Sequence, residues 1–229
     1  MTVATRTRTD AQIHQDVIRE LTWDTRVSET DVGVEVDHQV VTLTGSVPTY
    51  ARKLAAQEAA HRVAGVLDVA NDIEVVFPGQ RITDTDIAHR VRHALEWELM
   101  TPADKVTSTV RDGWVTLAGT VDSLSHSNDA ARAVRRIKGV RGLTNELTVK
   151  PAIRTDASNV RHEIEAALDR QAIRESGHLR IEIENGRVRL DGTVRSWPER
   201  RAVINAAKFT PGVTGVDESG LRVDPFGAV

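Results

Sequence analysis

The most constraining feature of the sequence is a seven-residue pattern that occurs three times. It reads Val-Thr-Leu-Thr-Gly-Ser-Val at 41–47, Val-Thr-Leu-Ala-Gly-Thr-Val at 115–121 and Val-Arg-Leu-Asp-Gly-Thr-Val at 188–194. Each copy alternates apolar and polar residues, which predicts a β-strand with one buried face. Gly45, Gly119 and Gly192 share the parity of the apolar residues. We therefore expect them to be structural glycines that let a helix cross close to the sheet.

The sequence around the motif repeats with it. Leu21, Leu95 and Leu168 each precede the motif glycine by 24 residues, and a Gly-Val pair follows that glycine after 20 residues. The period is 74 and then 73 residues, with one extra residue in the third copy near 217–220. This period is the length of a small domain rather than of a solenoid repeat. We predict three domains, at 9–77, 83–150 and 155–224.

Each unit has the same order of expected elements. A helix with apolar residues every four positions comes first, after a Thr-Asp pair that suits a helix N-terminus. Two alternating strands follow, joined by the hairpin signals Asp112-Gly113 and Asn185-Gly186 in the second and third units. The first unit has His38-Gln39 there, and we expect a looser turn.

A second helix and a last strand complete each unit. Since every strand alternates, each sheet buries one face, and both helices must cover that face. The prediction is an α+β fold of three tandem αββαβ units, each a small mixed sheet with two helices on one face. The short linkers at 77–83 and 150–155 contain Pro and are expected to hold neighbouring units close.

Composition excludes several classes of function. The chain has no Cys and a net charge of −3, so it lacks thiol chemistry and the basic excess of a nucleic-acid binder. No apolar run approaches the roughly 20 residues of a membrane span. We expect no metal, no cofactor and no nucleic-acid partner. The N-terminus carries no signal peptide, which predicts a cytoplasmic protein, or a periplasmic one if the sequence was trimmed.

The second unit, from Asp84 to Val149, reads Asp-x-x-Ile, Ala-Leu, Asp-Gly-x-Val-Thr-Leu-x-Gly-x-Val, Gly-Val and Asn-x-Leu-x-Val in order. This pattern resembles the BON domain, a family named for bacterial osmotically inducible and nodulation proteins. The resemblance extends to all three units. It implies an αββαβ fold, no enzymatic activity and a binding role, with attachment to phospholipid surfaces during osmotic or other stress as the usual suggestion. For cytoplasmic relatives, small-ion or protein binding has been proposed.

Two groups of residues are candidates for binding. Trp23 and Trp97 lie at the ends of the first helices of units one and two, where they either sit in a membrane interface or cap the core. The second helix of unit two carries a basic cluster, which meets anionic headgroups or is a solvated face. Its site residues are Arg132, Arg135 and Arg136.

The other conspicuous residues are expected to be structural. Trp114 has the outward parity of its strand, so it is exposed or buried against a neighbouring unit, and we favour burial. Trp197 is expected to pack as a staple at a helix start. His89 and His93 have the i, i+4 spacing of metal ligands, but the flanking Arg residues oppose a cation.

Together these observations predict a non-enzymatic BON-domain protein that binds phospholipid membrane surfaces in an envelope or osmotic stress response. The alternative is a cytoplasmic scaffold that binds a protein, a small ligand or an ion.

Overall fold

A computed structural model describes residues 8–27, 32–77, 79, 82–99, 105–150, 156–170 and 179–224. Unit 1 consists of α1 (Asp10–Trp23), β1 (Val32–Asp37), β2 (Val40–Val47), α2 (Tyr50–Arg62), β3 (Asp68–Asn71) and β4 (Glu74–Val75). Unit 2 consists of α3 (Asp84–Leu99), β5 (Val106–Arg111), β6 (Trp114–Val121), α4 (Leu124–Arg135) and β7 (Gly142–Val149). Unit 3 consists of α5 (Ala157–Arg170), β8 (Arg180–Glu184), β9 (Arg187–Val194), α6 (Trp197–Lys208) and β10 (Gly215–Val223).

The three sheets share one topology. In each, the first two strands form an antiparallel hairpin, and the third pairs parallel to the middle strand after the helical crossover. The third strand of unit 1 is broken into β3 and β4, which both pair with β2. In β10 the register shifts between Asp217 and Gly220, where the sequence has its extra residue. The predicted α+β class and αββαβ order are confirmed.

Local sequence accounts for the helices. Thr9 caps α1 in a capping box with Gln12, and hydroxyl N-caps also precede the second helices, at Thr49, Ser123 and Ser196. The apolar stripe of each first helix is buried against its sheet. The stripes are Ile13, Val17 and Leu21, then Ile87, Val91 and Leu95, and then Val160, Ile164 and Leu168.

The motif glycines are structural, but for a different reason from the one predicted. Gly45, Gly119 and Gly192 have φ values of 112°, 125° and 137°, a region that is essentially closed to other residues. A side chain at Gly119 would strike the backbone carbonyl of Lys105, which leads into the paired strand β5. The close neighbour at Gly119 is therefore a strand, not a crossing helix.

The first hairpin turn is as tight as the other two, so the expected looser turn is wrong. His38 and Gln39 have φ values of 47° and 65°, both in the left-handed region. Asp10 at the start of α1 accepts hydrogen bonds from both of their backbone N–H groups, at 3.0 and 2.9 Å. Asp84 makes the same pair of bonds to Asp112 and Gly113. A carboxylate 28 residues away thus supports a turn that the local sequence does not favour.

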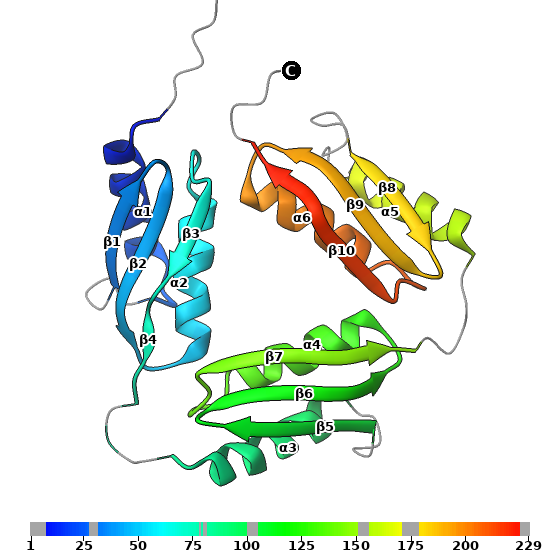
Figure 1. Cartoon of the computed structure of the whole chain (residues 1–229), viewed down its shortest axis with the longest axis horizontal. Coiled ribbons are helices and arrows are strands. Elements are labelled where there is room, and N and C mark those ends of the chain that lie inside the picture. The colour runs from blue at the N-terminus through cyan, green and yellow to red at the C-terminus, as the bar shows by residue number, and fades with distance from the viewer. Residues whose placement is uncertain are drawn as a thin grey trace, which may run out of the picture.

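The three units are arranged around a common centre (Figure 1). The edge strands β3, β7 and β10 and the helices α2, α4 and α6 lie nearest to that centre, while β1, β5 and β8 lie at the periphery (Figure 1). Helices α2 and α6, from the first and last units, contact each other directly. The chain therefore closes into a ring, in keeping with the close units that the short linkers predict.

Candidate functional site

The ring is held at each junction by the same position of the repeat. Tyr50, Leu124 and Trp197 are the first residues of α2, α4 and α6. Tyr50 packs against the cores of units 1 and 2, and Leu124 packs against the cores of units 2 and 3. Trp197 of unit 3 stacks on His61 of unit 1, with ring centroids 4.1 Å apart. Each unit thus contacts the next head to tail, and the third contact closes the ring.

Charged groups surround the closing contact. The guanidinium of Arg200 lies 5.4 Å from the centroid of the Trp197 ring, a cation–π distance. Arg201 lies 3.8 Å from the Glu58 carboxylate across the junction. Burial, followed by the positive charge of Arg201, lowers the pKa of His61 to about 4. His61 is therefore neutral in the closed ring at neutral pH.

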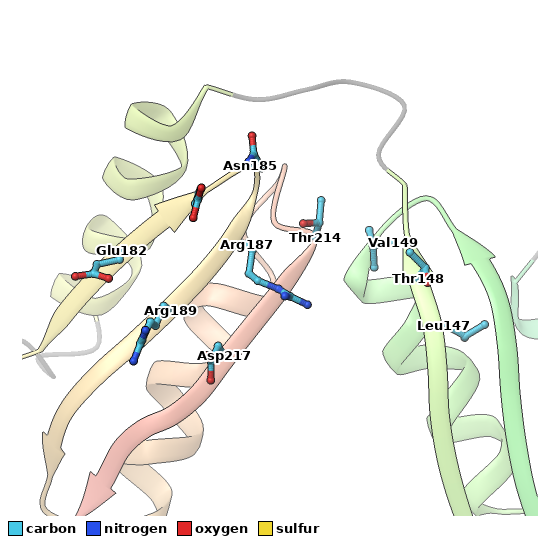
Figure 2. A pocket seen from close by; sticks show the side chains of 10 residues that line it. Leu147, Thr148, Val149, Glu182, Asn185, Arg187, Arg189, Thr214 and Asp217 are labelled. Atoms are coloured by element: carbon cyan, nitrogen blue, oxygen red, sulfur yellow. The ribbon is translucent and has the colours of Figure 1, made fainter.

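Grooves lie beside the other two junctions. One groove, of about 1200 Å³, lies between the β3–β4 region of unit 1 and the turn region of unit 2 that contains Asp112. The other, of about 760 Å³, lies between the end of β7 and the strands β8 to β10 (Figure 2). The repeat-equivalent residues Asp112 and Asn185 line the two grooves, which again indicates that one junction geometry is repeated. Both grooves are open and lined by residues of mixed polarity.

The two predicted tryptophans of the helix ends are strongly exposed. Trp23 is 78% exposed and Trp97 is 75% exposed. The indole Nε1 of Trp97 donates a hydrogen bond to Nε2 of His93, 3.3 Å away. His93 therefore accepts a hydrogen bond from the tryptophan. Of the two readings that the sequence allowed, packing on the core is wrong, because neither ring is covered by the described residues. The interface reading stays a prediction.

The predicted basic cluster lies on the same two-helix layer as Trp97. Arg132, Arg135 and Arg136 are all exposed at the end of α4, and Arg132 forms an ion pair with Asp129. The guanidinium of Arg90 on α3 donates to the backbone carbonyl of Lys138 at 3.1 Å. The end of α4 therefore lies beside the first half of α3, and Trp97 lies two turns further along. The arginines and Trp97 therefore lie on one surface of unit 2. Among the described residues, no direct contact joins these arginines to the indole.

The equivalent surface of unit 1 is neutralised by ion pairs. Arg62 on α2 binds Glu20 at 2.6 Å and Asp24 at 2.8 Å, and Arg26 binds Glu58 at 3.1 Å. Hydrogen bonds from these arginines, chiefly Arg26, hold the pKa of Asp24 far below its usual range.

The sequence of unit 2 changes this pattern at three positions, one of which is Met100 in place of Arg26. Ala94 replaces Glu20 and Arg132 replaces Glu58, while Glu98 keeps the acidic position of Asp24. The two-helix layer of unit 2 is therefore the more basic of the two.

The structure also places the two remaining tryptophans, Trp114 and Trp197. Trp114 is 51% exposed and packs on its own unit, so the expected burial against a neighbouring unit is wrong. Trp197 packs across a junction rather than only as a local staple. Within the part of the chain that the structure describes, no group of three His, Asp or Glu side chains is placed to hold a metal ion. Among the same residues, no helix is long and apolar enough to cross a membrane.

Sequence reasoning missed the junction residues Tyr50 and Leu124. Their signal was available, since each is an apolar residue directly after a hydroxyl N-cap, at the position of Trp197. Each of these apolar residues lies on the first turn of its helix, outside the buried stripe of its own unit. Such a residue is expected to pack against a neighbouring unit.

The three αββαβ units, their motif glycines and their shared topology define a protein built from three tandem copies of one small α+β domain. The chain belongs to the BON domain family, which matches residues 9–76, 83–151 and 156–225. It is similar to osmotically-inducible protein Y of Escherichia coli (strain K12), with 30% identity over 146 residues. That match covers 62% of this chain and 73% of the relative.

Solved structures of CdsD, a structural protein of the type III secretion system of Chlamydia trachomatis, also match. The C-terminal domain shares 12% identity at a TM-score of 0.25, covering 95% of this chain and 100% of that one. A second CdsD structure shares 13% identity at a TM-score of 0.23, covering 89% and 88%.

Proposed function

We propose that the chain attaches without catalysis to anionic phospholipid surfaces, and that it does so during osmotic stress. The observation that carries the proposal is the exposure of Trp97, at 75%, on the same helical layer as the exposed basic cluster of Arg132, Arg135 and Arg136. A large exposed indole is uncommon on a surface that contacts only water. Trp combines an apolar body with a polar N–H and is suited to the headgroup region of a bilayer. The osmotically inducible name of the relative supports the stress context.

The ring supports a common orientation of the two tryptophans. Trp23 and Trp97 occupy equivalent positions in units 1 and 2, and the same type of junction relates successive units. A rotation about the centre of the ring keeps equivalent residues on one side of it. Trp23 and Trp97 therefore meet one flat surface together, and unit 2 adds the basic contacts.

Vesicle co-sedimentation tests the proposal. We expect the protein to bind vesicles that contain phosphatidylglycerol and not vesicles of phosphatidylcholine alone. Binding should weaken between about 50 mM and about 500 mM salt, since the contacts are electrostatic and exposed. Absence of binding to the anionic vesicles at low salt would overturn the proposal.

Charge reversal locates the surface. Basic residues near an anionic membrane contribute about 1 kcal/mol each, so replacing Arg132, Arg135 and Arg136 by Glu should weaken binding by at least about a hundredfold. The matched control replaces three exposed arginines of unit 3 by Glu, namely Arg180, Arg195 and Arg222. It should bind nearly as well as the wild type. Equal losses in both triple variants would show only a response to net charge.

The second candidate is a scaffold in the cytoplasm that binds a protein or a small ligand. It is favoured by the open groove between units 2 and 3 (Figure 2), which has both acidic and basic residues. This candidate predicts a protein partner in a pull-down and no response to lipid. Cell fractionation checks the expected cytoplasmic location at the same time.

A further inference from the structure

The sheet of each unit has one face that the helices leave uncovered. In unit 2 the alternation of the strands points eleven positions to this side. They are Thr107, Thr109, Arg111, Trp114, Thr116, Ala118, Thr120, Gly142, Thr144, Glu146 and Thr148. Six of these positions are threonines, which is the feature that separates this face from its two counterparts.

The threonines form rows across the strands. Thr109 pairs with Thr116, and Thr116 pairs with Thr144, so three hydroxyl side chains stand side by side across the whole sheet. Thr120 and Thr148 form a second pair further along. Each hydroxyl can both donate and accept a hydrogen bond. The rows therefore present uncharged donors and acceptors at regular spacing.

The equivalent rows of the other units are charged. In unit 1 the row is Glu35, Thr42 and Ala70, and in unit 3 it is Glu182, Arg189 and Asp217. The three rows occupy equivalent positions of one sheet topology, so they differ in the chemistry of their side chains. Only the row of unit 2 suits a neutral polar partner.

Trp114 completes the face of unit 2. Its indole lies directly on the backbone of Gly142 in the neighbouring strand, where a Cβ atom would overlap the ring. Its Nε1 donates to Oγ1 of Thr144 at 2.8 Å, which fixes the ring against the sheet. Half of the side chain, 51%, is still exposed. The result is a fixed aromatic surface beside a row of hydroxyl groups.

We propose that the open sheet face of unit 2 binds an uncharged saccharide chain. A sugar ring has an apolar C–H face that packs on an indole, and its edge carries hydroxyl groups that bond to the threonines. From Trp114 to Thr120 the face extends about 20 Å along the strand, which accommodates several sugar rings. The carboxylate of Glu146 and the guanidinium of Arg111 are the two charges among its eleven positions, and they are of opposite sign.

The far end of the face is continuous with the groove between units 2 and 3. Thr148 is both the last outward threonine of β7 and a lining residue of that groove (Figure 2). A saccharide chain that lies along the face can therefore continue into this open groove, so the face does not limit its length. Helices α3 and α4 lie on the other side of the sheet, so this site is separate from the proposed lipid surface.

Calorimetric titration of the full chain with chitohexaose, the neutral hexamer of N-acetylglucosamine, tests the proposal. We expect saturable binding, and at least about tenfold weaker binding for Trp114→Ala and for Thr116→Glu. The matched control is Thr42→Glu, which is the same substitution at the equivalent position of unit 1 and should leave the affinity unchanged. A sulfated hexasaccharide of similar length should bind at least about tenfold more weakly than chitohexaose.

Thermal unfolding of each variant shows that a loss of binding is not a loss of folding. No heat of binding at millimolar chitohexaose with the wild type would overturn the proposal, and so would equal binding by Thr116→Glu. A dimer of the wild type in sedimentation, converted to a monomer by Thr116→Glu, would assign the face to a second copy of the chain and would also overturn it. Vesicle binding is expected to be unchanged in all three variants.

Discussion

The indole of Trp197 in unit 3 lies flat on the imidazole of His61 in unit 1, with an angle of 14° between the ring planes. These residues are 136 positions apart, and their contact joins the last unit of the ring to the first. It differs from the junctions made by Tyr50 and Leu124, because its partner His61 is an imidazole, which gains a proton in the acidic range. The closing contact is therefore expected to respond to acidification.

Acidification should weaken the closing contact. The ordinary pKa of His is 6.5, and burial with the positive charge of Arg201 lowers that of His61 to about 4. Arg200 acts in the same direction, and the carboxylates of Glu58 and Asp68 act against it. Because the folded pKa is depressed, the contact has its full strength above about pH 6.5 and loses it as the pH falls to about 4. The loss should be about 1–2 kcal/mol, since solvent still reaches the ring.

Small-angle scattering as a function of pH measures this effect. We expect the radius of gyration to increase between about pH 6.5 and 4 as unit 3 separates from unit 1. His61→Phe keeps an aromatic partner for Trp197 and has no proton to gain, so its radius should stay constant over this range. Identical pH profiles for the wild type and this variant would contradict a role for His61.

Removal of the indole should open the ring at neutral pH. Trp197 is half-buried and has its main contact across the junction, so Trp197→Ala should cost about 1–3 kcal/mol of closure. The radius of gyration should rise while the helical content stays that of the wild type. Trp114→Ala is the control, because that indole packs within unit 2. A compact Trp197→Ala protein would show that the linkers and the other contacts between α2 and α6 close the ring without the indole.

The motif glycine of unit 2 gives a test of backbone strain. At Gly119, φ is 125° and an added Cβ would meet the carbonyl of Lys105, so Gly119→Ala should destabilise unit 2 by about 2–4 kcal/mol. Gly33→Ala in unit 1 is the comparison. There an added Cβ would meet the hydroxyl of Thr44, which is a side-chain atom that can move. Urea unfolding should show the larger loss at Gly119, and equal losses would contradict the strain argument.

Parity and capping in the sequence were sufficient to predict the fold. The alternation around Leu43, Leu117 and Leu190 identified the buried face of each middle strand, because side chains of a strand alternate between its two faces. The same pattern could not reveal why the glycines are present, since parity says nothing about φ. Nor could it reveal the tight turn at His38, which depends on Asp10, a residue remote in the sequence.

The candidate site was predicted only in part, for a similar reason. The sequence left the exposure of Trp23 and Trp97 open, because a tryptophan at the end of an apolar stripe can either sit in an interface or cap the core. The ring required knowledge of how three complete units pack, and its contacts are made by single residues such as Tyr50 that no periodic pattern marks. The surface charge of unit 2 could be found by comparing repeats, because Arg132 stands where unit 1 has Glu58.

The last prediction concerns Asp84, the aspartate that supports the hairpin turn of unit 2. Both carboxylate oxygens of Asp84 accept backbone N–H groups, from Asp112 at 2.8 Å and from Gly113 at 2.9 Å. Asp84→Ala leaves these two donors without a protein partner. When buried, a charge-assisted hydrogen bond of this kind contributes at most about 1.5–3 kcal/mol to stability. Since Asp112 is exposed and only Gly113 is buried, we expect a loss of about 1–2 kcal/mol, measured by urea unfolding.

Asp122→Ala is the matched control, because Asp122 is exposed and has no hydrogen bond or ion pair among the described residues. Unit 3 supplies an internal comparison, since it has Ala157 at the position of Asp84 and forms its turn with Asn185 and Gly186. Amide hydrogen exchange should therefore show faster exchange at Asp112 and Gly113 in Asp84→Ala, with the turn of unit 3 unchanged. Unchanged exchange at both amides would mean that the turn residues alone hold the hairpin, as they do in unit 3.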